Sequence, residues 1–197
     1  MEEMFCFQCQ QTAHNSGCEG RAGVCGKKSD TANYQDELTG ALIGLSRAVR
    51  KKLALNPDAS FEHADELILK GLFTTITNVN FFNDTIIGLI HEVNVEKDRI
   101  YPDIMNYDVR HIWEDQEDIR SLKSLILFGL RGMAAYAYHA YALDYTDRNV
   151  LDFFYEGLEA IASEKSSDEL LALVLKTGEI NFRCMELLDH ANSGTYG

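Results

Sequence analysis

The chain has 197 residues, enough to bury a hydrophobic core, and its 18 basic and 31 acidic residues give a formal net charge of −13. This acidic balance disfavours nucleic-acid phosphates and anionic membrane surfaces, so neither is expected as a partner. The N-terminus lacks a leader-like pattern, and no stretch approaches the ~18 apolar residues of a membrane span. Five cysteines, four of them near one end, suit metal binding in a reducing compartment. We therefore expect a cytoplasmic protein.

Residues 1–30 are predicted to be a loop that binds a metal cluster. They combine four cysteines with closely spaced glycines and show no apolar periodicity. The glycines are Gly17, Gly20, Gly23 and Gly26. Because glycine lets a backbone wrap tightly and turn its N–H groups inward, this segment can surround a sulfur-rich anion.

Residues 31–100 are predicted to form a first bundle of three helices. Apolar residues recur at helical spacing in the first helix, which Asn56-Pro57 ends. Its predicted buried positions are Leu38, Ala41, Leu42, Leu45, Ala48 and Val49. Ser60 is the candidate N-cap of the second helix, and the third begins near Asn83. The positions of the third helix predicted to face inward are Ile86, Ile87, Ile90 and Val93.

A second three-helix bundle is predicted over residues 115–197, after a connector over 101–114. Trp113 of the connector is expected to pack against a bundle. The first helix of this bundle is predicted to end at Leu143, and Asp147 or the preceding threonine opens the next.

The last helix begins with a Ser-x-x-Glu capping box, Ser166 to Glu169, and is predicted to stop at Gly194. No segment has a convincing strand pattern. The predicted fold class is therefore all-α, with two three-helix bundles preceded by the N-terminal loop rich in glycine and cysteine.

The candidate metal ligands are Cys6, Cys9, Cys18 and Cys25. Their spacing, Cys-x2-Cys-x8-Cys-x6-Cys, puts four soft thiolates on one loop, and such ligands select iron–sulfur clusters or zinc over hard cations. Zinc sites usually pair two short knuckles, whereas six residues separate the second pair here. Spacing therefore favours an iron–sulfur cluster and leaves zinc open. His14 is a weaker candidate, because clusters with histidine ligands pair two histidines.

Polar residues beside the cysteines have two interpretations each. Gln8, Gln10 and Gln11 either hydrogen-bond near the cluster or face solvent. Lys27 and Lys28 either offset the cluster's charge or are solvated.

Two features elsewhere are interpreted as ordinary. Cys184 lies among apolar residues of the last helix and is predicted to be a buried, inert thiol. The long acidic helices raise the alternative of a di-iron carboxylate bundle, but no histidine has a glutamate three residues before it.

Several segments carry a pattern beyond the cysteines. They are Met4–Ala13, Gly17-Cys18, Gly23–Lys27, Leu72–Phe81, Glu117–Leu122, Gly129–Tyr136, Met185–Asp189 and Gly194–Gly197. These segments resemble the N-terminal helical domain of the hybrid cluster proteins, also called prismane proteins or hydroxylamine reductases. The resemblance runs through essentially the whole chain.

The resemblance implies two three-helix bundles and a [4Fe-4S] cubane on the four cysteines. Some family members have a longer gap between the second and third cysteines and carry [2Fe-2S] there; the gap of eight between Cys9 and Cys18 is similar to that of the cubane type. In full-length members a catalytic hybrid cluster is bound by two later α/β domains, whose ligands are missing here. The sequence therefore predicts the N-terminal domain alone.

The function implied is electron relay toward a hybrid cluster that reduces hydroxylamine or nitric oxide. Expected partners are a redox protein, the missing catalytic domains, or a second copy through the exposed domain interface. The alternative is a structural or subunit-assembly domain that a four-cysteine iron–sulfur or zinc site only stabilises. A net charge of −13 should disfavour adding an electron, to an extent that salt screening limits.

Overall fold

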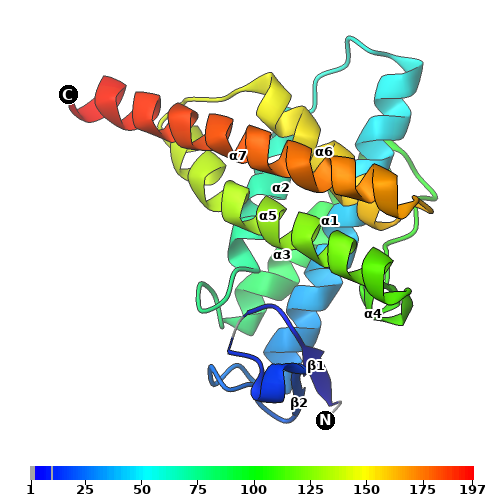
Figure 1. The fold of residues 1–197 in the computed structure, drawn as a ribbon. Coiled ribbons are helices and arrows are strands. Elements are labelled where there is room, and N and C mark those ends of the chain that lie inside the picture. Colours follow the sequence, from blue (N-terminus) through cyan, green and yellow to red (C-terminus); the bar gives the residue numbers. More distant parts are fainter. Residues whose placement is uncertain (1–2, 10) are drawn as a thin grey trace.

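The computed structural model describes residues 3–9 and 11–197. These residues form seven α-helices, a 3-10 turn and a small sheet, which confirms the predicted all-α class (Figure 1). The elements are β1 (Met4–Cys6), η1 (Ala13–Asn15), β2 (Cys18–Gly20), α1 (Ser29–Leu55), α2 (Glu62–Thr74), α3 (Asn83–Ile100), α4 (Arg110–Glu114), α5 (Glu117–Tyr141), α6 (Arg148–Ile161) and α7 (Ser167–Tyr196).

The segment predicted as loop, residues 1–30, contains two paired strands. β1 is antiparallel to β2, with Met4 opposite Gly20 and Cys6 opposite Cys18. Each strand has only three residues, too few for an alternating pattern to stand out. The expectation of a chain without strands was therefore wrong at this place.

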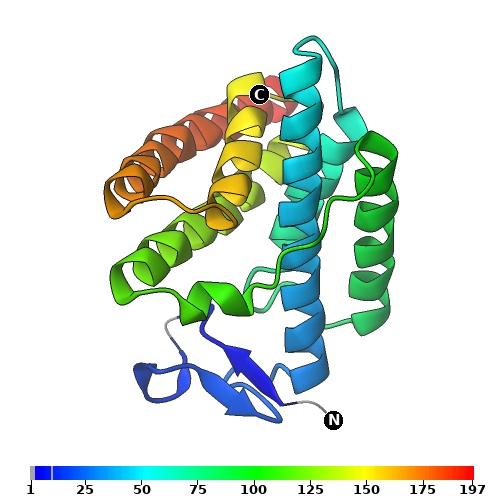
Figure 2. The ribbon, with the colours of Figure 1, turned by 90° about the vertical axis from the view of Figure 1, so that its right-hand side faces the viewer.

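The helices form two groups of three that share one core. In the first group α1 contacts both α2 and α3, and in the second all three of α5, α6 and α7 contact one another. The groups meet where α1 contacts α6 and α2 contacts α5. Buried apolar side chains from both groups belong to a single cluster, so the two predicted bundles pack as one body. Figures 1 and 2 show the β1–β2 pair beside the start of α1, at the opposite end of the molecule from the C-terminus.

The helical spacing predicts the core of α1 correctly. All six positions named for it have no exposed surface. In α3, however, Ile87 is exposed, whereas Ile86 and Ile90 are buried. Adjacent residues of a helix point about 100° apart, so Ile87 points away from the side of α3 that Ile86 and Ile90 bury.

The caps of the later helices match their sequence signals better than the cap of α2 does. Asp147 accepts a hydrogen bond from the Asn149 amide, and Ser166 forms the expected capping box with Glu169. The prediction of Ser60 as a cap is wrong, because α2 starts after Phe61 without a side-chain cap. α7 also continues past the predicted stop at Gly194 to Tyr196.

The connector packs along α1 through two glycines. Figure 2 shows the segment after α3 crossing α1 before it reaches α4. The Tyr107 amide donates to the Gly40 carbonyl at 3.1 Å. A side chain at Gly40 would collide with the Tyr107 carbonyl, and one at Gly44 would meet Asn106. Glycine at these positions therefore lets the connector approach the helix backbone.

Within the described residues, every helix is too short or too polar to span a bilayer.

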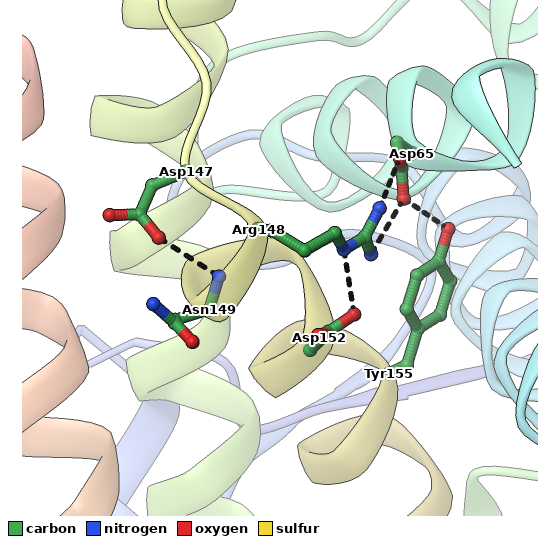
Figure 3. Close-up of polar contacts among 6 residues, drawn as sticks. All are labelled: Asp65, Asp147, Arg148, Asn149, Asp152 and Tyr155. Carbon is green, nitrogen blue, oxygen red and sulfur yellow. Dashed lines mark hydrogen bonds and ion pairs between the residues drawn. The ribbon is translucent and has the colours of Figure 1, made fainter. Parts of the chain in front are cut away.

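A buried carboxylate joins the two helical groups. Asp65 of α2 is 5% exposed and accepts a 2.6 Å hydrogen bond from the Tyr155 hydroxyl of α6 (Figure 3). Arg148, at the start of α6, donates to both carboxylate oxygens, at 2.8 and 3.2 Å, and also to Asp152. Breaking this network would leave the buried Asp65 carboxylate with fewer partners. The network therefore favours one arrangement of α2 against α6.

Replacing Tyr155 by Phe should lower the free energy of unfolding by about 1.5–3 kcal/mol, the range for a hydrogen bond to a charged group. The ring and its packing are retained, so the loss reports the hydroxyl. Tyr138→Phe is the matched control, because the Tyr138 hydroxyl has no hydrogen bond within the described part of the chain. Denaturant unfolding measures both, and equal losses would contradict the assignment.

The difference in free energy of unfolding between the native protein and the Tyr155→Phe variant should depend on pH. Burial, and then the charge of Asp65, raise the pKa of Tyr155 in the folded protein. Above the unfolded pKa of about 10, only the unfolded state loses this proton, so the native protein loses stability as pH rises. The Tyr155→Phe variant lacks this loss, and the stability gap between the two should narrow above pH ~10. A constant gap would show that the hydroxyl is not shielded.

Candidate functional site

The pairing of β1 with β2 brings two of the four cysteines together. Cys6 and Cys18 are directly opposite each other in the register. Side chains of directly opposite residues lie on the same face of an antiparallel pair. Two cysteines with eleven residues between them are thus brought side by side by strand pairing.

The other two cysteines lie at turns next to this pair. The Thr12 amide donates to the Cys9 carbonyl and turns the chain back after β1. Cys25 lies in a turn closed by hydrogen bonds from Gly26 to Gly23 and from Gly23 to Lys27. Gly26 has a φ of 84°, which a residue with a side chain seldom adopts.

All four cysteines line one cavity. Its lining consists of Met4, Cys6, Cys9, Gln11, Thr12, Cys18, Gly23, Cys25, Lys27 and Thr77. Among the residues that the structure describes, no three His, Cys, Asp or Glu side chains converge closely enough to hold a single ion. The thiols therefore surround a space rather than meet at one point.

Aromatic residues attach the cysteine segment to the helices. Phe5 and Phe7 flank Cys6, and their ring centroids lie 4.7 and 4.6 Å from that of Trp113 in α4. Phe7 also contacts Phe128 of α5, at 6.2 Å. Trp113 thus packs against the cysteine segment as well as the helices, and the cavity has a fixed position on the fold.

Lys27 is the buried cation of the cavity. Its exposed fraction is 2%, whereas its neighbour Lys28 is exposed. In the part of the chain that the structure describes, the Lys27 ammonium has no hydrogen bond and no carboxylate within ion-pair distance. A buried charge without a partner is costly, so this lysine favours an anionic occupant of the cavity.

A second buried cation lies behind the cysteines. Arg131 of α5 is 6% exposed and donates to the Thr75 hydroxyl at 3.1 Å and the Thr39 hydroxyl at 3.0 Å. The Asp36 carboxylate accepts a 3.2 Å hydrogen bond from the Gln8 side chain, between Cys6 and Cys9. Gln8 thus links the cysteine segment to Asp36 of α1, which interacts electrostatically with Arg131.

Burial dominates the ionisation of these groups. It raises the pKa of the Cys6 thiol, which the Gln8 amide and the cations of Lys27 and Arg131 oppose only in part. It also raises the pKa of Asp36 to about 6, although Arg131, Lys27 and Gln8 act in the opposite direction. The pKa of Arg131 falls to about 10. The interior behind the cysteines is therefore poorly solvated.

Only some of the other residues that the sequence suggested for the site line the cavity. Gln11 lines the cavity, whereas His14 is exposed and does not. Gln10 lies outside the described residues. Cys184 is fully buried in α7, away from the cavity, and burial raises the pKa of its thiol to about 12, as expected of an inert thiol.

Sequence reasoning missed three contributors. Thr77, from the segment between α2 and α3, lines the cavity although it lies far from the cysteines in the chain. Asp36 and Arg131 occupy helical positions that a periodicity argument assigns to an ordinary bundle. The signal available for Thr77 and Arg131 was their place within segments that carry the family resemblance.

Replacing Gly17 by Ala should destabilise the cysteine segment more than replacing Gly20. Both glycines have positive φ, 118° and 85°, so alanine strains the backbone at either position. At Gly17 the added carbon would also lie 2.5 Å from the Phe5 ring, which Trp113 holds, whereas nothing lies within 4 Å at Gly20. An extra loss of about 1–3 kcal/mol is expected in denaturant unfolding. Equal losses would show that the ring moves freely.

Comparison with known proteins confirms the resemblance. The family model described as the Prismane/CO dehydrogenase family matches residues 4–197. Proteins named hydroxylamine reductase are similar over nearly the whole chain. That of Desulfitobacterium hafniense strain Y51 is 38% identical, covering 98% of this chain and 40% of its own length. That of Caldanaerobacter subterraneus subsp. tengcongensis is 38% identical, covering 99% and 40%.

The hydroxylamine reductase of Methanocella arvoryzae is 39% identical, and the match covers 98% of this chain and 41% of the relative. The chain thus spans about two fifths of the length of the curated relatives it matches. With a family match over almost every residue and these identities, the chain belongs to the Prismane/CO dehydrogenase family.

Proposed function

We propose that the chain is a one-electron transfer domain whose N-terminal cysteines hold a [4Fe-4S] cluster. The observation that carries the proposal is the single cavity lined by Cys6, Cys9, Cys18 and Cys25. Four soft thiolates on a glycine-rich segment suit an iron–sulfur cluster. The gap of eight residues between Cys9 and Cys18 supports the cubane over [2Fe-2S].

The residues around the cavity fit an anionic group. A cluster with four thiolate ligands is negatively charged, and the buried Lys27 offers it an opposite charge. Met4 and Cys18 are buried, which shields that wall of the cavity from water. Cys6, Cys9 and Cys25 are half-buried and lie closer to solvent. Electron exchange with a partner is therefore proposed on the side of these three residues.

A bound cluster with four protein thiolates supplies electron transfer, because its irons keep no open position for substrate. The protein's part is to hold the thiolates in place. β1–β2 pairing fixes Cys6 against Cys18, and the Gly23–Gly26 turn fixes Cys25. Rigid ligands keep the geometry similar before and after electron transfer, which makes the transfer less costly.

The wider role is proposed by relation to the family. The relatives are named hydroxylamine reductase, and we propose that this domain relays electrons toward catalytic domains that reduce hydroxylamine or nitric oxide, in the cytoplasm. A redox protein would supply the electrons. Exposed apolar side chains along α7 offer a contact surface for those catalytic domains or for a second copy; they are Leu171, Leu175, Phe182 and Met185.

Anaerobically prepared protein is expected to contain four iron and four acid-labile sulfide per chain, with a broad absorption band that dithionite bleaches. Two of each would replace the cubane with [2Fe-2S]. A redox-silent preparation that holds zinc would overturn electron transfer and favour the structural role.

Cys9→Ser should lose most of the iron and sulfide, because it removes one ligand. Cys184→Ser is the matched control, since it changes a thiol outside the cavity, and it should keep the native content of both. Iron and sulfide analysis of both variants, with thermal unfolding, separates ligand loss from general destabilisation. Native iron content in Cys9→Ser would remove Cys9 from the ligand set.

A further inference from the structure

Among the residues that the structure describes, no carboxylate forms an ion pair with Lys27. Lys27 is 2% exposed and lines the cysteine cavity without an ion-pair or hydrogen-bond partner among the described residues. Such a position is unfavourable for an ammonium group unless negative charge is close. The Cys6 thiol and the Asp36 carboxyl are the groups whose ionisation it influences.

The charges around the cavity do not cancel. Lys27 and Arg131 are two buried cations, and neither has a carboxylate within ion-pair distance in the described part of the chain. Asp36 is the nearby acid that interacts with both. Even with Asp36 ionised, these two cations face one carboxylate that interacts with both of them. Lys28, by contrast, is exposed, so water and salt screen its charge.

We propose that Lys27 is a charge-compensating residue that raises the reduction potential of the group held in the cysteine cavity. This inference rests on the proposed function. Lys27 acts through its fixed positive charge and through no bond to the group. Arg131 acts in the same direction, and its hydrogen bonds to Thr39 and Thr75 make it the less suitable residue to replace.

The effect follows from charge balance. Reduction adds one electron from the donor to the bound group, no bond forms or breaks, and the negative charge grows by one. A nearby cation therefore stabilises the reduced form more than the oxidised form. In a poorly solvated interior this difference is larger than at the surface and less sensitive to salt. Removing the cation should make reduction harder.

The side chain of Lys27 can be changed without removing its backbone role. The Lys27 carbonyl accepts the Gly23 hydrogen bond that closes the cysteine turn, and every substitution keeps that carbonyl. Methionine preserves much of the length of the apolar stem and lacks the charge. Lys28→Met is a matched control, because it removes the same formal charge from the adjacent, exposed position.

The test is an anaerobic redox titration of the native chain, Lys27→Met, Lys28→Met and Lys27→Arg, with dithionite as the electron donor and midpoints read from absorbance. Lys27→Met should lower the equilibrium constant for reduction at least tenfold, which is a potential lower by 59 mV or more for a one-electron couple. Lys28→Met should change it less than about threefold, and less still at high salt. Lys27→Arg should remain close to the native chain.

The outcomes separate this inference from the proposed function. If the native chain holds no iron and sulfide, or shows no reversible reduction, the proposed function fails whatever Lys27 does. If the native chain is reduced reversibly and Lys27→Met has the native midpoint, only the inference about Lys27 fails.

If Lys27→Met cannot hold the group at all, iron and sulfide content decides instead. Retention in Lys27→Arg and Lys28→Met would support the need for a buried charge. Loss in Lys27→Arg as well would overturn it in favour of a packing role.

Discussion

The alternation of side chains along β1 determines where the cysteine cavity lies. Successive residues of a strand point to opposite sides, so Met4 and Cys6 line the cavity while Phe5 and Phe7 contact Trp113. The same short segment therefore supplies a cysteine of the cavity and the aromatic side chains that hold this cysteine in place. This aromatic contact adds to the contacts between β1 and α1 and to the Gln8–Asp36 hydrogen bond, which also hold the cysteine segment against the helices.

The long helices could be predicted from sequence because many residues report the same period. The six core positions of α1, the capping box at Ser166 and the cap at Asp147 each follow from a local rule. The common location of four cysteines was also predictable from their number and spacing. The strands were not, because three residues cannot establish a period of two. The ring contacts that hold β1 against Trp113 and Phe128 come from segments that are distant in the chain, so no local pattern indicates them.

The buried charges were beyond sequence reasoning for a different reason. Lys27 and Lys28 are adjacent and chemically identical, and only the turn after Cys25 decides that the first is buried. Arg131 resembles any helical arginine until the packing of α5 against α2 buries it and places it within hydrogen-bond distance of Thr39 and Thr75. Because Arg131 also bonds Thr39 and Thr75, the contact between the two helical groups and the electrostatics behind Cys6 share one side chain. A change in that packing is therefore expected to reach the site.

The net charge of −13 points to a low potential, whereas the buried residues point the other way. The distance of each charge from the cavity and its exposure to solvent determine which of the two effects is larger. Exposed acids act across water, where an ionic strength of 0.15 M limits their reach to about 8 Å. Lys27 and Arg131 act from within the fold, where the effective dielectric is lower and counter-ions do not enter. If the proposed function holds, we therefore expect the buried Lys27 and Arg131 to affect the reduction potential of the site more strongly than the surface acids do.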